Sequence, residues 1–305
     1  MIGAFRRRML RGEPIRESDG VNGSGTRSWV ERHLSIGGDR LAYIRTGGER
    51  GSVLLVHGNS SCKEIFEHQV SYLADLGYDV VAPDLPGHGN SDDACDPART
   101  YSFPGYADIL SNLMEQLGVG TYHVVGWSLG GHIGIEMWAT REAVRSLLIT
   151  GTPPVRLSPA GAAEGFLPSP TMDLAGKACF SEADVQAYGS AMLGTSIDPA
   201  SRLAWCIART HGEARRLMLE NGLAGLGQDE VAAVANCPKP LAIVQGKNDP
   251  FVYVPYLHRL TYNNLWLNNP IIVNAGHAPH WVQASEFNHY LGEFIELTSG
   301  SGGAA

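Results

Sequence analysis

Six short apolar runs constrain the fold of this chain more than any other feature of its sequence. They alternate with stretches of helical periodicity, and they are VLLVHG from Val53, DVVAPD from Asp79, HVVGWS from His123, LLITGT from Leu147, LAIVQG from Leu241 and IIVNAG from Ile271. Continuous apolar strands that alternate with helices are typical of a parallel sheet buried on both faces. The sequence therefore predicts an α/β fold with a mostly parallel central sheet and helices on both faces.

Two segments depart from this alternation. VERHLSIGG and DRLAYIRTG, which precede the first apolar run, alternate as an antiparallel hairpin does. Residues 152–238 are helical and turn-rich, with large apolar residues such as Phe166 and Trp205. An insertion after a strand's carboxyl end lies over the sheet edge where open α/β folds bind ligands. We predict a core domain of residues 29–151 and 239–297 with a helical lid of residues 152–238, whose aromatic residues mostly form the lid's own core.

Both ends of the chain are predicted to lie outside this fold. Residues 1–28 are rich in arginine but lack the apolar stretch of about 7 to 15 residues that a signal peptide contains, so a flexible extension is expected. The arginines between positions 6 and 11 would suit an organellar presequence, but acidic residues follow between positions 13 and 19. Residues 298–305 resemble a linker or expression scar, and we expect them to be disordered.

Charge and cysteine content limit the classes of partner. A formal net charge of −8 argues against nucleic-acid binding, which needs a concentration of basic residues. No uninterrupted apolar run approaches the roughly 18 to 20 residues of a membrane helix. The cysteines form no C-x-x-C pair, so we expect isolated buried thiols at Cys62, Cys95, Cys179, Cys206 and Cys237. A cytoplasmic monomer or weak homodimer with a small-molecule partner is the resulting prediction.

A serine lies at a predicted strand-to-helix corner in HVVGWSLGGH, residues 123–132. Residues 126–130 fit G-x-S-x-G, in which a tight strand–turn–helix holds the serine in strained backbone angles and exposes its oxygen at the top of the sheet. The positive end of the following helix favours an oxyanion beside the serine. Ser128 is therefore predicted to be a nucleophile, although a serine in a surface turn usually has no such role.

A serine hydroxyl is a weak nucleophile at neutral pH, so the chain should supply a base and a group that orients it. His277 follows the last predicted strand, and Asp249 follows the strand before it. His280 is the competing base, but it lies farther from the strand end and is expected to pack or face solvent. Asp249 could instead be a turn or capping residue before Pro250. The order Ser128, Asp249, His277 matches the order of the triad in α/β-hydrolases.

Two backbone amides are predicted to form an oxyanion hole. The first apolar run continues as VHGNSS, where the chain turns at Gly58 and Asn59 can direct its N–H toward a developing oxyanion. The second donor would be the N–H of Leu129, the residue after the nucleophile. His57 and His132 show no metal-type spacing, and His88 is expected to be structural.

Over residues 30–297 the chain resembles the α/β-hydrolases, and within them the serine-dependent N-acyl-homoserine lactonases. The resemblance rests on HGNSS, APDLPGHGNS, GYADIL, GWSLGGHIGIEM, ITGTPPV, NDPF, NLW and NAGHAP. It implies Ser128 as nucleophile, His277 as base, Asp249 as acid and Asn59 in the oxyanion hole. The resemblance also suggests a substrate contact for Tyr188 in the lid segment DVQAYG. Further substrate contacts are predicted at positions 127 and 58, which are Trp127 and Gly58.

The predicted function is the opening of the lactone ring of N-acyl-homoserine lactones (quorum quenching) through an acyl-enzyme. A general carboxylesterase is the nearest alternative, because the same groups cleave open-chain esters. A ligand receptor on a hydrolase fold, in which the lid transmits binding, is an alternative of another class. Epoxide hydrolase or dehalogenase chemistry is disfavoured, since those relatives carry Asp where this chain has Ser128. The H-x-H-x-D-H signature of metal-dependent lactonases is absent, so no metal and no cofactor is predicted.

Overall fold

An eight-stranded sheet forms the centre of the fold in residues 29–300, the part of the chain that the computed structural model describes. The strands follow the order β1-β2-β4-β3-β5-β6-β7-β8. They are β1 Glu31–Ile36, β2 Asp39–Arg45, β3 Ser52–Val56, β4 Asp79–Pro83, β5 Tyr122–Trp127, β6 Val144–Thr150, β7 Leu241–Gly246 and β8 Ile271–Val273. β2 pairs antiparallel with both of its neighbours, and the other pairs are parallel. The predicted mostly parallel sheet is confirmed, with the six apolar runs as β3 to β8.

The predicted hairpin forms the edge of the sheet. β1 and β2 pair in a register that places Ile36 opposite Asp39. The intervening residues, Gly37 and Gly38, have φ angles of +61° and +102°. These angles lie in a region that side chains other than glycine rarely adopt, which explains why two glycines occupy the turn.

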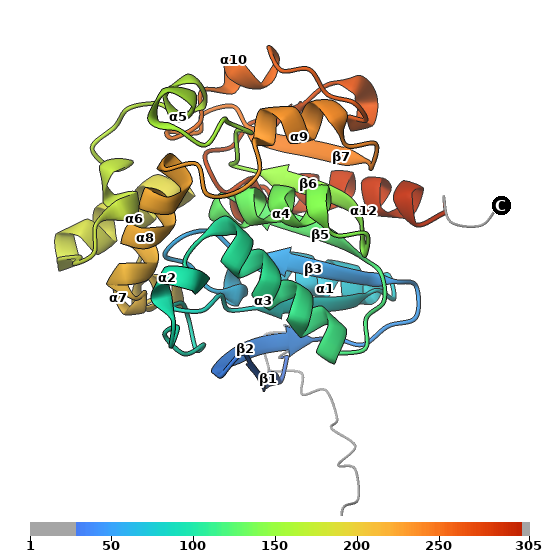
Figure 1. Ribbon diagram of the computed structural model, residues 1–305, viewed down its shortest axis with the longest axis horizontal. Helices are drawn as coiled ribbons and strands as arrows, with labels where there is room; N and C mark the ends of the chain where they lie inside the picture. Colours follow the sequence, from blue (N-terminus) through green and yellow to red (C-terminus); the bar gives the residue numbers. More distant parts are fainter. Residues whose placement is uncertain (1–28, 301–305) are drawn as a thin grey trace, which may run out of the picture. The chain divides into compact units, whose positions relative to one another are not determined.

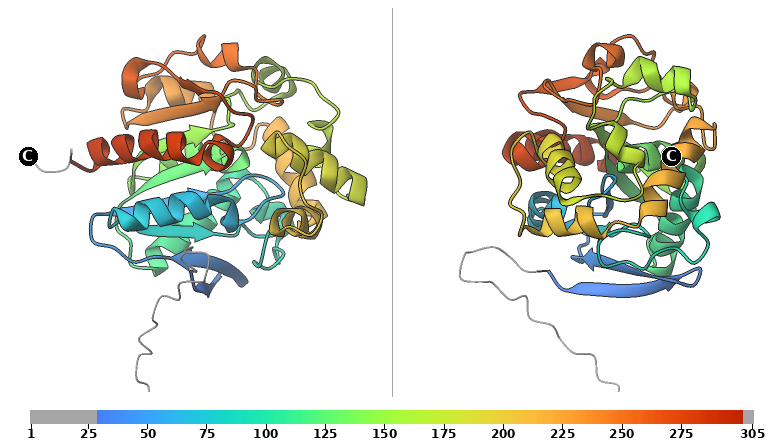
Figure 2. Two further views of the ribbon diagram at one scale, coloured as in Figure 1. Left: turned by 180° about the vertical axis from the view of Figure 1, so that it is seen from behind. Right: turned by 90° about the vertical axis from the view of Figure 1, so that its left-hand side faces the viewer.

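Helices cover both faces of the sheet, as Figures 1 and 2 show. One face carries α3 (Phe103–Gln116), α4 (Leu129–Thr140) and α9 (Glu230–Asn236), which pack against one another. The other carries α1 (Glu67–Asp75) and α12 (Ala284–Ser299). Burial on both faces accounts for the continuous apolar sequences of β4 and β5, in which every residue is buried.

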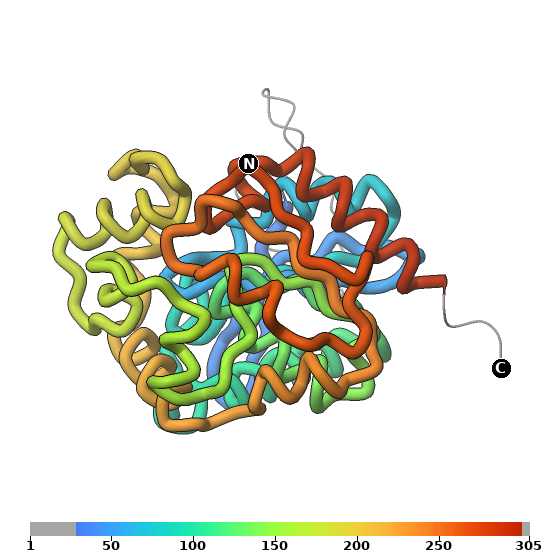
Figure 3. Tube along the Cα trace, turned by 90° about the horizontal axis from the view of Figure 1, so that it is seen from above, coloured from blue at the N-terminus to red at the C-terminus, as the bar shows by residue number. Residues whose placement is uncertain are grey.

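The segment between β6 and β7 is helical, and most of it lies beyond one end of the sheet (Figure 1). Its yellow part projects at the left of the tube in Figure 3. Its helices before α9 are α5 Pro159–Gly165, α6 Glu182–Leu193, α7 Arg202–Arg209 and α8 Gly212–Leu223. α9 falls within the predicted lid, residues 152–238, but packs against α4 of the core. The short helices of the chain are η1 Lys63–Phe66, α2 Pro97–Thr100, η2 Asp173–Gly176, α10 Val254–Leu257, η3 Trp266–Asn268 and α11 Pro279–Val282.

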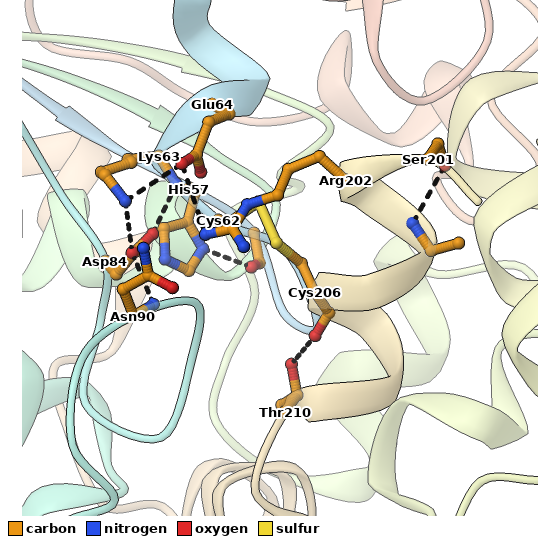
Figure 4. Close-up of a disulfide and its surroundings, with 12 residues drawn as sticks. His57, Cys62, Lys63, Glu64, Asp84, Asn90, Ser201, Arg202, Cys206 and Thr210 are labelled. Carbon is orange, nitrogen blue, oxygen red and sulfur yellow. Dashed lines mark hydrogen bonds and ion pairs between the residues drawn. A yellow bond between two sulfur atoms is a disulfide. The ribbon is translucent and has the colours of Figure 1, made fainter. Parts of the chain in front are cut away.

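The cysteines differ from the predicted isolated buried thiols. Cys62, in the loop after β3, and Cys206, in α7, form a disulfide that joins segments 144 residues apart (Figure 4). Cys95 and Cys179 are exposed. Pairing at this sequence separation depends on the tertiary fold, so no local spacing could reveal it. The cysteines therefore give no support for the predicted cytoplasmic location.

The carboxyl-terminal boundary also needs a correction. α12 extends to Ser299, two residues into the tail predicted from position 298. The hydroxyls of Thr298 and Ser299 donate hydrogen bonds to the carbonyls of Phe294 (2.8 Å) and Ile295 (2.7 Å), which hold the last turn. The predicted extension of residues 1–28, with its arginine cluster, lies outside the described residues, as do positions 301–305. Within residues 29–300, every helix is too short or too polar to cross a bilayer.

Candidate active site

Ser128 lies between β5 and α4 in a strained backbone conformation. Its φ of +54° and ψ of −120° are uncommon for a residue with a side chain. Glycines on both sides permit the turn, because a Cβ on Gly126 would collide with the carbonyl of Gly130, and a Cβ on Gly130 with the carbonyl of Val56. The G-x-S-x-G spacing thus follows from close backbone contacts around the serine.

His277 and Asp249 meet at the carboxyl ends of β8 and β7. The imidazole Nδ1 lies 2.8 Å from the carboxylate Oδ2, and both side chains are buried. The other oxygen, Oδ1, accepts the backbone amides of Phe251 at 2.8 Å and Val252 at 3.1 Å. Burial raises the pKa of Asp249, but the charge of His277 and the donated hydrogen bonds outweigh it and lower the pKa overall. The carboxylate is therefore held as an anion beside the imidazole.

Gln245, in β7, supports this pair and was absent from the predicted site. Its Nε2 donates to Oδ2 of Asp249 at 2.8 Å, and its Oε1 accepts the amide of Gly151 at 3.0 Å. Gly151 in turn packs closely on the imidazole, since a Cβ there would lie 2.8 Å from Cε1 of His277. A polar residue inside an otherwise apolar strand was the available sequence signal.

His280, the competing base, is fully buried outside the cavity described below. Its ring centroid lies 4.9 Å from those of both Phe66 and Trp127. Neither ring nitrogen has a hydrogen-bond partner within residues 29–300, and burial lowers the pKa of His280 well below its ordinary value. The imidazole is thus a neutral packing group, which leaves His277 as the candidate base.

The two amides predicted for the oxyanion hole belong to residues beside Ser128. Neither Asn59 nor Leu129 donates its backbone N–H to another group within the described part of the chain. The side chain of Asn59 is fixed, since Nδ2 donates to the carbonyl of Ala175 at 2.8 Å and Oδ1 accepts from Ser60 at 3.3 Å. Leu129 is the first residue of α4, where backbone amides lack intrahelical partners. Both amides are therefore available to a ligand.

A cavity of about 540 Å³ brings these groups together. Ser128, His277 and Asn59 line it from the core, and Tyr188 lines it from α6. Most other lining side chains are apolar and include Phe103, Val155, Phe166, Met172, Leu219 and Leu223. Within residues 29–300, Arg156 and Asp173 are the only lysine, arginine, aspartate or glutamate residues on its wall. The cavity suits a neutral molecule with an apolar chain.

The three predicted substrate contacts have different places. Tyr188 lines the cavity, and burial raises the pKa of its phenol to about 12, so the hydroxyl stays protonated. Trp127 is fully buried away from the cavity wall, and its indole N–H donates to the carbonyl of His277 at 2.9 Å. Gly58 packs beneath the same ring, since a Cβ there would lie 3.0 Å from it. Neither Trp127 nor Gly58 therefore lies on the cavity wall, and the indole supports the His277 loop.

The remaining histidines after β3 and β4 serve the fold. His57 interacts through Nδ1 with the carbonyl of Gly58 at 2.8 Å and through Nε2 accepts the amide of Leu85 at 3.0 Å. His88 Nδ1 lies 3.1 Å from the carbonyl of Pro86. Burial lowers the pKa of both histidines, so both are neutral. These contacts fix the two loops and leave neither histidine at the cavity.

Potential metal ligands gather at one other place. Within residues 29–300, Cys62, Glu64 and Cys206 are the only group of ligand atoms close enough together to hold a metal ion. The two sulfurs are already joined as a disulfide, as Figure 4 shows. None of the three residues lines the cavity.

Comparisons with known proteins show which hydrolases the chain is similar to. The sequence model of the "Alpha/beta hydrolase family" matches residues 53–289. A mutant of the N-acyl homoserine lactonase AidH, solved with N-hexanoyl homoserine lactone, is 41% identical with a TM-score of 0.84, over 88% of this chain and 98% of that one. AidH complexed with N-butanoyl homoserine is 40% identical with a TM-score of 0.85, over 90% and 100%. A 2-hydroxy-6-oxononadienedioate/2-hydroxy-6-oxononatrienedioate hydrolase of Burkholderia vietnamiensis is 26% identical over 88% of this chain and 97% of that protein.

Proposed function

The chain belongs to the alpha/beta hydrolase family, and from this premise we propose that it opens the lactone ring of N-acyl-homoserine lactones. The observation that carries the proposal is that Ser128 lines the same apolar cavity as His277, whose imidazole is paired with Asp249. Similarity to AidH, at 40% identity over the whole of that chain, supports a lactone as the substrate. The apolar wall would hold the acyl chain.

In the proposed reaction, Oγ of Ser128 attacks the carbonyl carbon of the lactone. Nδ1 of His277 is engaged by Asp249, so Nε2 takes the serine proton as the C–O bond forms. The amides of Asn59 and Leu129 donate to the oxygen that becomes negative, where donors aligned in advance stabilise the transition state. His277 then gives its proton to the ring oxygen as the ring C–O bond breaks.

The second half of the reaction returns the serine to its starting state. The product of ring opening stays attached to Ser128 as an ester. His277 removes a proton from water, the resulting hydroxide attacks this ester, and the proton passes to Oγ of Ser128 as it leaves. The net change is the addition of one water to the lactone, which yields an N-acyl-homoserine.

Three alternatives to lactone opening can be distinguished by experiment. A carboxylesterase would use the same groups on open-chain esters. The dioate substrate in the name of the Burkholderia relative carries two carboxylates, whereas Arg156 is the only lysine or arginine on the cavity wall within residues 29–300. Two carboxylates buried with a single cation would be poorly compensated, so this cavity favours a neutral acyl lactone. A receptor built on the fold would bind the lactone without steady turnover.

Product analysis by mass spectrometry tests the proposal. The purified protein is incubated with long-chain N-acyl-homoserine lactones, p-nitrophenyl esters and a 2-hydroxy-6-oxo-dienedioate, beside Ser128→Ala. We expect ring-opened N-acyl-homoserine without free fatty acid, and no product with Ser128→Ala. Fatty acid would indicate amide cleavage, whereas ester or dienedioate turnover without lactone turnover would overturn the proposed substrate. At most a few cycles per molecule would favour the receptor.

A further inference from the structure

A second buried histidine faces the same cavity. His132, in α4, is 8% exposed and lines the cavity together with Ser128. Its Nδ1 lies 2.7 Å from Oε1 of Glu230, the first residue of α9. The other carboxylate oxygen of Glu230 accepts the amide of Val155 at 2.9 Å. With both of its oxygens engaged, the carboxylate fixes the orientation of the imidazole.

Aromatic side chains flank the ring of His132. Phe103 stacks on it at a centroid distance of 5.3 Å and an interplanar angle of 9°, and Phe166 lies 5.9 Å away at 41°. Both phenylalanines also line the cavity. Nε2 is the remaining polar atom of the imidazole, and no group within residues 29–300 forms a hydrogen bond with it.

A structural role explains the contact of one ring nitrogen of His132, Nδ1, but not the position of the other, Nε2. The bond from Nδ1 to Glu230 ties α4 to α9, but it leaves Nε2 at an apolar cavity wall. A polar atom at such a wall loses water when an apolar ligand binds, which costs free energy unless the ligand offers a partner. The position of Nε2 therefore favours a ligand with a polar atom of its own at this point.

The spacing along α4 indicates which atom of the ligand this is. His132 follows Ser128 by four residues, and its amide donates to the carbonyl of Ser128 at 3.3 Å, so the two backbone positions lie one helical turn, about 5 to 6 Å, apart. In an N-acyl-homoserine lactone, five bonds separate the lactone carbonyl carbon from the third carbon of the acyl chain. An extended chain advances about 1.2 Å per bond, which places that carbon about 6 Å from the attacked carbonyl.

Resting on the proposed lactone-opening function, we propose that Nε2 of His132 binds a hydroxyl group on the third carbon of the acyl chain. A hydroxyl both donates and accepts, so it pairs with the imidazole in either protonation state. A keto oxygen only accepts and pairs only with a protonated Nε2. Hydroxylated acyl chains are therefore preferred over both keto and unsubstituted chains of the same length.

The test compares kcat/KM for three N-acyl-homoserine lactones of one chain length, with a hydroxyl, a keto group or no substituent on the third carbon. In the unmodified protein, the hydroxylated substrate is expected to be preferred about fivefold over the unsubstituted one, the scale of one hydrogen bond. His132→Asn keeps an amide near the Nδ1 position for Glu230 and removes Nε2. The preference should fall to about one in this variant.

The ratio of kcat/KM for two substrates does not depend on how much of the protein is folded, since both substrates are measured on the same sample. Should His132→Asn fail to fold, the double variant His132→Phe/Glu230→Gln keeps the aromatic ring and removes the buried charge. His123→Asn is the matched control, because His123 is a buried histidine away from the cavity. It should keep the fivefold preference. A ratio near one in the unmodified protein, or an unchanged ratio in both His132 variants, would overturn the proposal.

A second substrate pair separates failure of this subsite from failure of the proposed function. In p-nitrophenyl 6-hydroxyhexanoate, the hydroxyl-bearing carbon also lies five bonds from the attacked carbonyl, and p-nitrophenyl hexanoate is its unsubstituted match. Loss of lactone turnover with a His132-dependent preference for the hydroxyester would reject the lactone function and retain the subsite. Steady lactone turnover without a His132-dependent ratio would do the reverse.

Discussion

Two histidine–carboxylate pairs face one cavity, and they differ in what lies beside each imidazole. His277 bonds to Asp249 at 2.8 Å and His132 bonds to Glu230 at 2.7 Å, in both cases through Nδ1. Aromatic rings flank both imidazoles, but His277 alone is placed among the groups proposed for catalysis. An oriented imidazole is therefore common to both pairs. The surroundings, and not the pair itself, decide whether it suits proton transfer or ligand binding.

The carboxylates also differ in the number of donors around them. Asp249 accepts from His277, Gln245 and two backbone amides, and its pKa is lowered in spite of burial. Glu230 accepts from His132 and the single amide of Val155. The Asp249 pair is thus the better prepared to stabilise a positive charge that forms on its imidazole during a reaction.

The largest expected effect comes from exchanging each carboxylate for its amide. Asp249→Asn should lower kcat about 10⁴-fold, because the amide favours the wrong tautomer of His277. Glu230→Gln, the matched change in the other pair, should alter kcat for an unsubstituted acyl substrate by less than about threefold, because His132 takes no part in the proposed proton transfers. Steady-state kinetics on folded samples, with folding checked by circular dichroism, measures both. Similar losses in the two variants would remove the distinction between the pairs.

His123, a buried histidine whose contacts are hydroxyls and not a carboxylate, extends the comparison to the pH dependence of stability. His123 contacts the hydroxyls of Ser146 at 2.8 Å and Ser299 at 3.2 Å, and burial, followed by the charge of Arg145, lowers its pKa to about 4. As pH falls from about 6.5, the unfolded chain binds this proton first, so the stabilisation present above pH 6.5 is lost by about pH 4. The loss amounts to about 3 kcal/mol. Urea unfolding at pH 7 and 4.5 should show a smaller pH dependence for His123→Asn, and an unchanged dependence would contradict the assignment.

The sequence predicted those features of the site that depend on local pattern. Ser128, Asp249 and His277 each follow an apolar run, and carboxyl ends of parallel strands meet at one edge of a sheet. His132 was set aside for want of metal-type spacing, because its partner Glu230 lies 98 residues further along the chain. Such contacts depend on how α4 and α9 pack, which periodicity does not reveal.

The surroundings of Trp127 and Cys62 share a feature that the sequence does not reveal. The indole of Trp127 is buried beneath the His277 loop. Cys62 pairs with Cys206 of α7, within the helical insertion and 144 residues further along the chain. In both cases the side chain's neighbours come from distant segments, so its position follows from tertiary packing alone.

A smaller effect should come from Gln245, which supports the His277–Asp249 pair but not the His132–Glu230 pair. Gln245→Leu removes the donor to Asp249, and the loss of one hydrogen bond to a charged group should lower kcat by about 10- to 30-fold. Gln245→Glu keeps an acceptor for the amide of Gly151 but places a second carboxyl beside Asp249, so it should lower kcat at least as much as Gln245→Leu. Both variants should keep the proposed preference for hydroxylated acyl chains, which depends on His132. A Gln245→Leu protein with full kcat would show that Asp249 needs no support from β7.

The smallest expected effect concerns Tyr188, which lies at the His277 end of the cavity. Its ring is 6.1 Å from that of Phe251, which lies 4.7 Å from the imidazole of His277. With a pKa of about 12, the phenol donates a hydrogen bond throughout the neutral range. We expect this donor to bind the lactone or amide. Tyr188→Phe should therefore weaken transition-state binding by about 0.5 to 1.5 kcal/mol, which lowers kcat/KM. The loss should be equal for hydroxylated and unsubstituted acyl chains, in contrast to His132→Asn, and kinetics on that substrate pair measures it. An unchanged kcat/KM in Tyr188→Phe would mean that the ring only packs within the helical insertion. A loss confined to hydroxylated chains would instead mean that Tyr188 acts beside the His132–Glu230 pair.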